Sequence, residues 1–170
     1  MRFELTLRFE FGSCEGVLVS DRAKRTADLF QQAKDQEALQ NAVELKHSAT
    51  LDEGFSRMRK KINEALERQC TELNEQPEIG DILVCKVSDD KSTTVTRSDT
   101  GVVLSVAFDS TLRTAHFACP KPSKFKYSID VKLSANGLWF YADGKGTSIG
   151  PDLGAVTDKA LNALLGVTVG

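Results

Sequence analysis

The sequence lacks the marks of several large classes of protein. It has no CxxC pair among its four cysteines, so it predicts neither a zinc framework nor a disulfide scaffold. It has no apolar run near the roughly 18 residues of a membrane span. Near the start, four charged residues interrupt the apolar core that an export signal needs: Arg2, Glu4, Arg8 and Glu10. We therefore expect a cytoplasmic protein without a membrane partner.

The sequence also has no large excess of either positive or negative charge. The net charge is −2, and no segment is strongly acidic or basic. Proteins that bind nucleic acid through its phosphates carry a basic surface, so nucleic acid is not an expected partner. With 41% hydrophobic and 27% charged residues over a length of 170, the composition is that of one ordinary globular domain, residues 1–170.

Motifs for phosphate binding and for hydrolysis are absent. Residues 144–150 are rich in glycine and precede a predicted helix, but Gly146 separates Lys145 from Thr147, whereas the phosphate loop needs lysine directly before the hydroxyl. Asp152 is the expected N-cap of that helix, and its charge would oppose a phosphate there. We expect residues 144–150 to be a flexible connector, and no cofactor is predicted.

His116 and Cys119 are the only histidine and cysteine that lie close together in the sequence. A metal pair, or a thiol nucleophile with its base, needs both side chains on one side of the chain. An offset of three residues in a strand places them on opposite faces. The sequence therefore predicts no metal site and no catalytic residues, although an enzyme with a site near this pair stays as an alternative.

The first twenty residues predict a strand or a hairpin. Large apolar residues alternate with polar ones over residues 1–11, which is typical of a half-buried strand. Residues 12–16 contain two glycines and predict a turn, after which 17–19 return as a short second strand.

Residues 21–76 predict a long helical hairpin. The first arm has a weak stripe of small apolar residues and Phe30, while the second has a continuous stripe from Phe55 to Leu73. Thr50 and Glu53 have the spacing of a capping box, which predicts the start of the second arm. Because residues 47–50 make a short connection, we expect the two arms to be antiparallel.

From residue 79 to 142 the pattern has period two, and short connections rich in turn residues separate the runs. This predicts an antiparallel meander of five to six strands, the clearest over residues 124–133. A short helix is predicted over residues 151–166. The fold class is therefore α+β, with helices that cover the apolar face of the sheet.

Besides an enzyme with a site near His116 and Cys119, two functions are compatible with this fold. The one we expect is a non-enzymatic module for protein interaction or assembly, with another protein or a second copy of the chain as partner. The surface we expect for it is the lysine row Lys124, Lys126 and Lys132 on one predicted strand. The element order is similar to that of helix-grip folds, an analogy of topology that implies a carrier of a small apolar ligand as an alternative.

Overall fold

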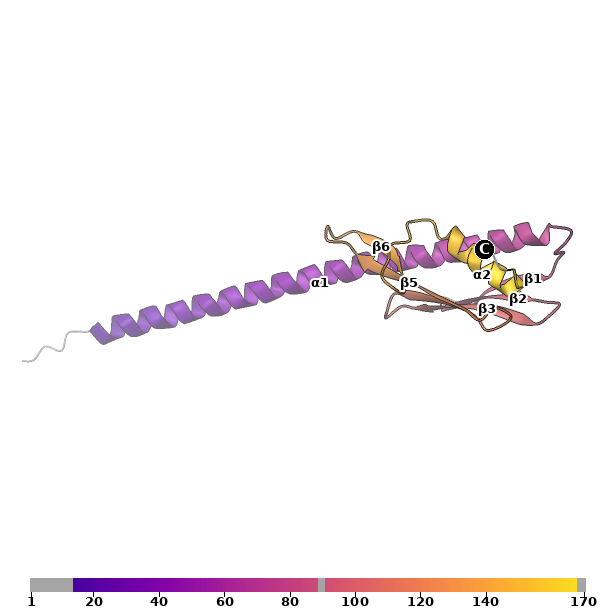
Figure 1. Ribbon diagram of the computed structural model, residues 1–170. Coiled ribbons are helices and arrows are strands. Elements are labelled where there is room, and N and C mark those ends of the chain that lie inside the picture. The colour runs from indigo at the N-terminus through magenta and orange to yellow at the C-terminus, as the bar shows by residue number, and fades with distance from the viewer. Residues whose placement is uncertain (1–13, 89–90, 168–170) are drawn as a thin grey trace, which may run out of the picture. The chain divides into compact units, whose positions relative to one another are not determined.

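The computed structural model describes residues 14–88 and 91–167, with side chains from residue 21 onward, and its class is α+β. Figure 1 shows the two helices and the sheet. The elements, in chain order, are α1 (Cys14–Asn74), β1 (Leu83–Ser88), β2 (Ser92–Arg97), β3 (Val102–Asp109), β4 (Thr114–Cys119), β5 (Phe125–Leu133), β6 (Trp139–Asp143) and α2 (Gly154–Leu165). The predicted meander and the short C-terminal helix are confirmed.

Contacts within the chain group it into two units, one up to Leu45 and one from Lys46 onward. That the chain forms a single domain stays a prediction.

The predicted helical hairpin is wrong, because α1 is one continuous helix of 61 residues. Residues 47–50 contain neither glycine nor proline, so nothing in them interrupts the helix. The Thr50 hydroxyl donates to the carbonyl of Lys46, one turn back, at 2.9 Å. Glu53 accepts a bond from Arg57 at 2.6 Å. The two residues read as a capping box thus support the interior of a helix.

The N-terminal hairpin is wrong in its second strand, because the backbone is helical from Cys14 onward and includes residues 17–19. One glycine inside a helix costs only about 1 kcal/mol, and a long helix accommodates it. The first predicted strand, residues 1–11, lies outside the described residues.

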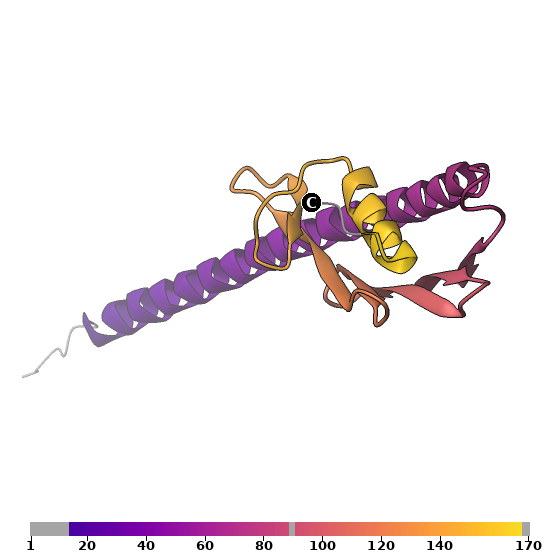
Figure 2. The same cartoon turned by 45° about the vertical axis from the view of Figure 1, so that its right-hand side comes forward.

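The six strands form one antiparallel sheet in sequence order, with β1 and β6 at its edges. Its inner face packs against α2 and against the section of α1 from residue 46 to 74 (Figure 2). From α1 this core takes Phe55, Met58, Ile62, Leu66 and Cys70, all under 9% exposed. The sequence predicted that helices cover the apolar face of the sheet, and this is confirmed. The covering helix is a section of the continuous α1 and not one arm of a hairpin.

Gly54 marks the closest approach of α1 to the sheet. A methyl group at this position would lie 2.7 Å from Val131 Cγ1 and 2.9 Å from the Trp139 ring. Contacts of that length do not occur, so only glycine fits here. The helix tolerates it because packing outweighs the loss of helix propensity.

The end of α1 is joined to the start of β1 by one side chain. The Asn74 amide donates to the Leu83 carbonyl at 2.8 Å, and its oxygen accepts from the Leu83 N–H at 2.9 Å. This pair of bonds satisfies backbone groups of an edge strand that has no neighbour on that side.

Helix α2 begins two residues later than the predicted N-cap. Asp152 accepts a bond from the Gly154 N–H at 2.9 Å, and Leu153 occupies the N-cap position. The helix ends at Leu165, within one residue of the predicted end, and Gly166 is its C-cap with a left-handed backbone.

Candidate functional site

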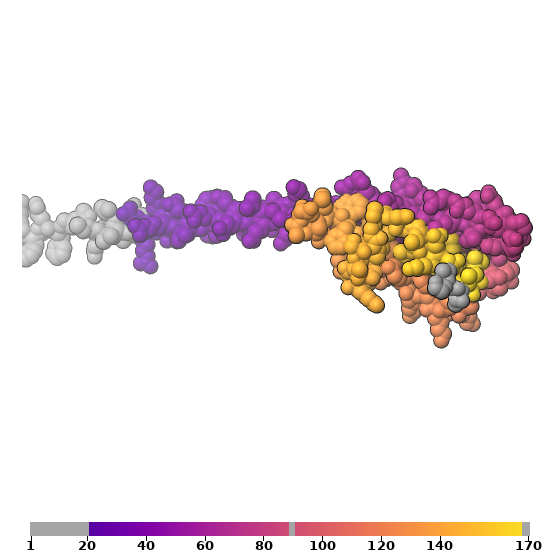
Figure 3. Space-filling model, turned by 45° about the horizontal axis from the view of Figure 1, so that its top comes forward, coloured from indigo at the N-terminus to yellow at the C-terminus, as the bar shows by residue number. Residues whose placement is uncertain are grey.

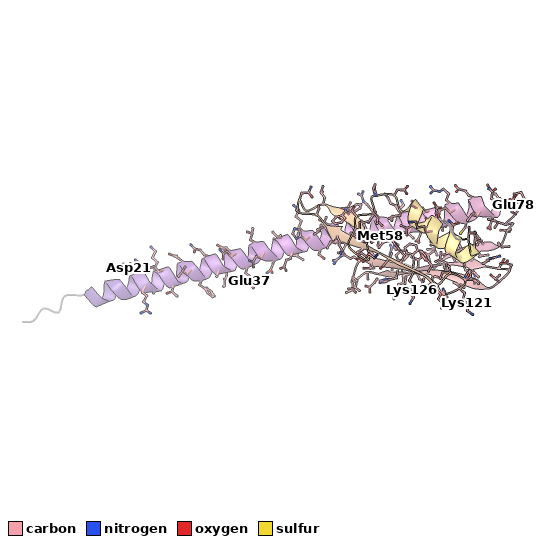
Figure 4. The ribbon with its side chains drawn as sticks, viewed as in Figure 1. Asp21, Glu37, Met58, Glu78, Lys121 and Lys126 are labelled. Carbon is pink, nitrogen blue, oxygen red and sulfur yellow. The ribbon has the colours of Figure 1, made fainter. Side chains whose placement is uncertain are left out.

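The N-terminal section of α1, residues 21–45, is exposed along its whole length; we call it the exposed section. Every residue from Asp21 to His47 is exposed. Figure 3 shows this part of the helix bare on the face in view, and Figure 4 shows side chains leaving it in all directions, Asp21 and Glu37 among them. Large apolar side chains are included: Leu29, Phe30, Leu39, Val43 and Leu45.

Charge is distributed unevenly along the exposed section. Its first turns hold three basic residues, Arg22, Lys24 and Arg25, together with the acidic Asp21 and Asp28. Its later turns hold three acidic residues: Asp35, Glu37 and Glu44. Between them, the Lys34 ammonium lies 4.7 Å above the ring of Phe30, a cation–π distance. Both signs therefore occur in the first turns, and acidic residues are in excess in the later ones.

A groove of about 950 Å³ lies in the second unit, between the last turns of α1, α2 and the segment leading into β5. Its apolar lining includes Leu73, Phe125 and Leu161. Gln69 also lines it and is only 7% exposed; its amide donates to the Gly154 carbonyl at 3.3 Å, while its oxygen has no hydrogen-bond partner among the described residues. An acceptor in this state favours a donor from outside.

His116 and Cys119 lie on opposite faces of the sheet, as their spacing predicted. His116 is exposed on the outer face of β4, whereas Cys119 is 0% exposed on the inner face. The Cys119 thiol donates to the Lys121 carbonyl at 2.8 Å, and burial raises the pKa of this thiol. His47 is exposed on α1. The alternative of an enzyme at this pair therefore loses the geometry it needs.

No group of three histidine, cysteine or carboxylate side chains that could hold a metal ion occurs in the part of the chain that the structure describes. Over the same residues, no helix has both the length and the apolar character needed to cross a bilayer.

The glycine-rich segment 144–150 is organised by Asp143. Its carboxylate accepts bonds from the backbone N–H groups of Thr147 at 2.8 Å and Lys145 at 3.0 Å. These bonds hold the pKa of Asp143 below its usual value. Two of the amides that could bind a phosphate, those of Lys145 and Thr147, are therefore already paired with a protein carboxylate.

The lysine row does not form one cluster. Lys126 and Lys132 are exposed and six residues apart on β5, which is about 20 Å along a strand. Asp130 lies between them and is 3.9 Å from the Lys132 ammonium. Lys124 precedes the strand with a left-handed backbone. Whether these residues contact a partner stays a prediction.

Aromatic residues do not extend the lysine row into a stacking surface. Tyr141 is buried on the inner face of β6, and its ring lies 5.1 Å from that of Trp139, which also packs against the core. In Figure 4, Lys126 lies on the side of the sheet away from Met58, a core residue of α1.

Two features of the second unit were not predicted from the sequence. One is the groove, whose lining comes from segments far apart in the chain. The other is a pair of thiols, Cys70 and Cys85, which belong to one core cluster. Their separation of fifteen residues carries no motif, although Cys70 lies on the stripe of α1 and Cys85 on the inward phase of β1.

Comparisons of the chain with models of protein families, with curated proteins and with solved structures found no match.

Proposed function

We propose that the protein is a non-enzymatic assembly module that pairs with a second copy of itself through the exposed section of α1. The observation that carries this proposal is a regular helix that is exposed at every position from Asp21 to Leu45 and displays two large apolar side chains, Phe30 and Leu45, on one side. Most helix stability in proteins comes from packing of an apolar face, and isolated helices are marginal in water. Such a section gains most from a covering surface.

The face that carries Phe30 and Leu45 suits a helix of the same sequence. At 100° per residue, Ala23, Ala38, Phe30 and Leu45 lie on one side of the helix. In an antiparallel pair, Phe30 lies opposite Ala38 of the other copy, and Leu45 lies opposite Ala23. Each large side chain then meets a small one, which is how well-packed helices interdigitate. Phe30 and Leu45 are 62% and 72% exposed in the single chain, so both have apolar surface to bury.

Light scattering and sedimentation of the full chain test this proposal. We expect a dimer whose dissociation constant rises at least tenfold in a variant with Phe30→Glu and Leu45→Glu. The matched control is Leu39→Glu, an equally exposed leucine on another side of the helix, which leaves the dimer intact. A wild-type chain that stays monomeric at every concentration, or a control that dissociates it equally, contradicts the proposal.

We infer a second candidate function from the groove. Its volume of about 950 Å³, its apolar lining and the unpartnered Gln69 oxygen suit a small apolar ligand with one hydrogen-bond donor. Titration with decanol, followed by NMR, tests it: we expect shifts at Leu73, Phe125 and Leu161 that disappear in Leu161→Trp, which fills the groove. Shifts spread over the whole surface, or none, reject it.

A further inference from the structure

The end of α1 and the edge strand β1 bring two cysteines together. Asn74 is bonded to both backbone groups of Leu83, so the last turn of the helix lies against the start of the strand. Cys70 is one turn before Asn74, about 6 Å along the helix, and Cys85 is two residues after Leu83, about 7 Å along the strand. The chain reverses direction between α1 and β1, as Figure 2 shows. Going back from Asn74 to Cys70 and on from Leu83 to Cys85 therefore brings the two cysteines side by side.

The burial of the two side chains agrees with this placement. Along β1, Leu83 is buried, Val84 is exposed and Cys85 is half-buried, so Cys85 shares the inner face of the strand with Leu83. Cys70 is 3% exposed in the core cluster against which Cys85 packs. One thiol is therefore enclosed, and its neighbour is reached from solvent.

We propose that Cys70 and Cys85 are a redox-sensitive pair that closes to an intramolecular disulfide when the protein meets a small disulfide oxidant such as oxidised glutathione. This inference is independent of the self-association proposed above, since it uses only residues of the second unit.

The chemistry follows the two environments. The thiols share a hydrogen bond that Cys70 donates, and this bond lowers the pKa of Cys85 and raises that of Cys70. Cys85 is thus the better source of thiolate, which is the form that attacks a disulfide. A nearby Glu67 opposes this effect on Cys85.

The reaction balances in two exchanges. The Cys85 thiolate attacks one sulfur of oxidised glutathione, forms a mixed disulfide and releases one glutathione thiolate. Cys70 then loses its proton and attacks the Cys85 sulfur, which forms the protein disulfide and releases the second glutathione. The two protein thiols give up two protons and two electrons, and glutathione disulfide is reduced to two thiols.

The closed form would bind the last turns of α1 covalently to an edge strand. Two strong restraints already act there, the bonds of Asn74 to Leu83, so the disulfide would add to an existing junction and need little movement of the backbone. We expect the thermal midpoint of the oxidised chain to rise above that of the reduced chain.

Mass spectrometry of the native full-length chain tests the proposal. Trypsin releases both cysteines in one peptide, residues 69–86, because the cleavable sites on either side are Arg68 and Lys86. After incubation with oxidised glutathione, we expect this peptide to be lighter by about 2 Da, the mass of two hydrogen atoms. Further cleavage after Glu72, Glu75 and Glu78 then leaves two pieces that separate only after reduction.

Two variants make the result specific. Cys119→Ser removes a thiol that is also buried but lies away from the pair, and it leaves the mass loss unchanged. Cys85→Ser abolishes the mass loss and leaves Cys70 unmodified, and far-UV circular dichroism verifies that this variant is folded. A native chain that keeps both thiols, while the chain unfolded in guanidinium forms the disulfide, overturns the proposal. So does a chain that stops at the mixed disulfide on Cys85.

Discussion

The two sections of α1 have the same backbone conformation and opposite surroundings. From residue 46 to 74 the helix buries an unbroken stripe of large side chains against the sheet, with Met58, Ile62 and Leu66 at 0% exposure. From residue 21 to 45 it buries nothing within its own unit. The comparison teaches that helix formation and helix packing are separate properties of this sequence. Good helix formers such as alanine, glutamine and glutamate keep residues 21–45 helical although they do not pack against the sheet.

The sharpest test of this comparison is one substitution made in each section. Leu66→Ala removes a fully buried side chain and is expected to lower the free energy of unfolding by about 2–5 kcal/mol. Leu39→Ala, in the exposed section, is expected to change it by less than about 0.5 kcal/mol. Urea unfolding followed by the fluorescence of Trp139, the single tryptophan, measures both. Equal losses would show that the exposed section is packed as firmly as the other.

Gly54→Ala separates packing from helix propensity at one position. Propensity alone predicts that alanine stabilises the helix by about 1 kcal/mol. The approach of Val131 and Trp139 predicts the opposite sign, a loss of about 1–3 kcal/mol, because the added methyl group overlaps both. Ser56→Ala, two residues on and exposed, is the control and stays near wild type. A stabilised Gly54→Ala protein would contradict the close approach.

Asn74→Ala tests how the packed section ends. The substitution removes both bonds to Leu83 and is expected to cost about 1–2 kcal/mol. Hydrogen exchange should speed up at the Leu83 amide more than at amides in the centre of the sheet. Gln76→Ala is the control, since its side chain donates to the Glu72 carbonyl of α1 and not to β1. If both variants exchange alike, the side chain of Asn74 is not what holds β1.

The smallest effect is expected from Gln36→Gly in the exposed section. Glycine lowers local helix stability by about 1 kcal/mol, so amides within a turn of residue 36 should exchange faster. The unfolding midpoint reported by Trp139 should not change, because that residue belongs to the other unit. A shift of the midpoint would show that the two sections unfold together.

Much of the fold could be predicted from local patterns. The strand from Phe125 to Leu133 was expected within one residue, because alternation identifies a strand with one buried face. The helical character of residues 21–76 was also predicted, whereas its division into two arms was wrong. Thr50 and Glu53 have the same spacing in a capping box and in a helix interior, and only the backbone around them decides which bonds they make.

The candidate sites were much less predictable. The opposite faces of His116 and Cys119 follow from strand geometry, so the sequence was sufficient to doubt that pair. The groove was not foreseeable, because Leu73, Phe125 and Leu161 come from three segments that meet only in the folded chain. The thiol pair required the junction between Asn74 and Leu83, which no spacing in the sequence reveals.

The sequence by itself determined the α+β class, the meander and the inward face of its strands, because these depend on periodicity over a few residues. The tertiary structure alone decided that α1 is continuous, that Gly54 must remain glycine and that Cys70 meets Cys85. Each of these depends on an approach between distant segments, and the free energy of such a contact belongs to the pair and not to either local pattern. The exposed section lies between the two cases, because its residues determine that it is helical but do not determine its partner.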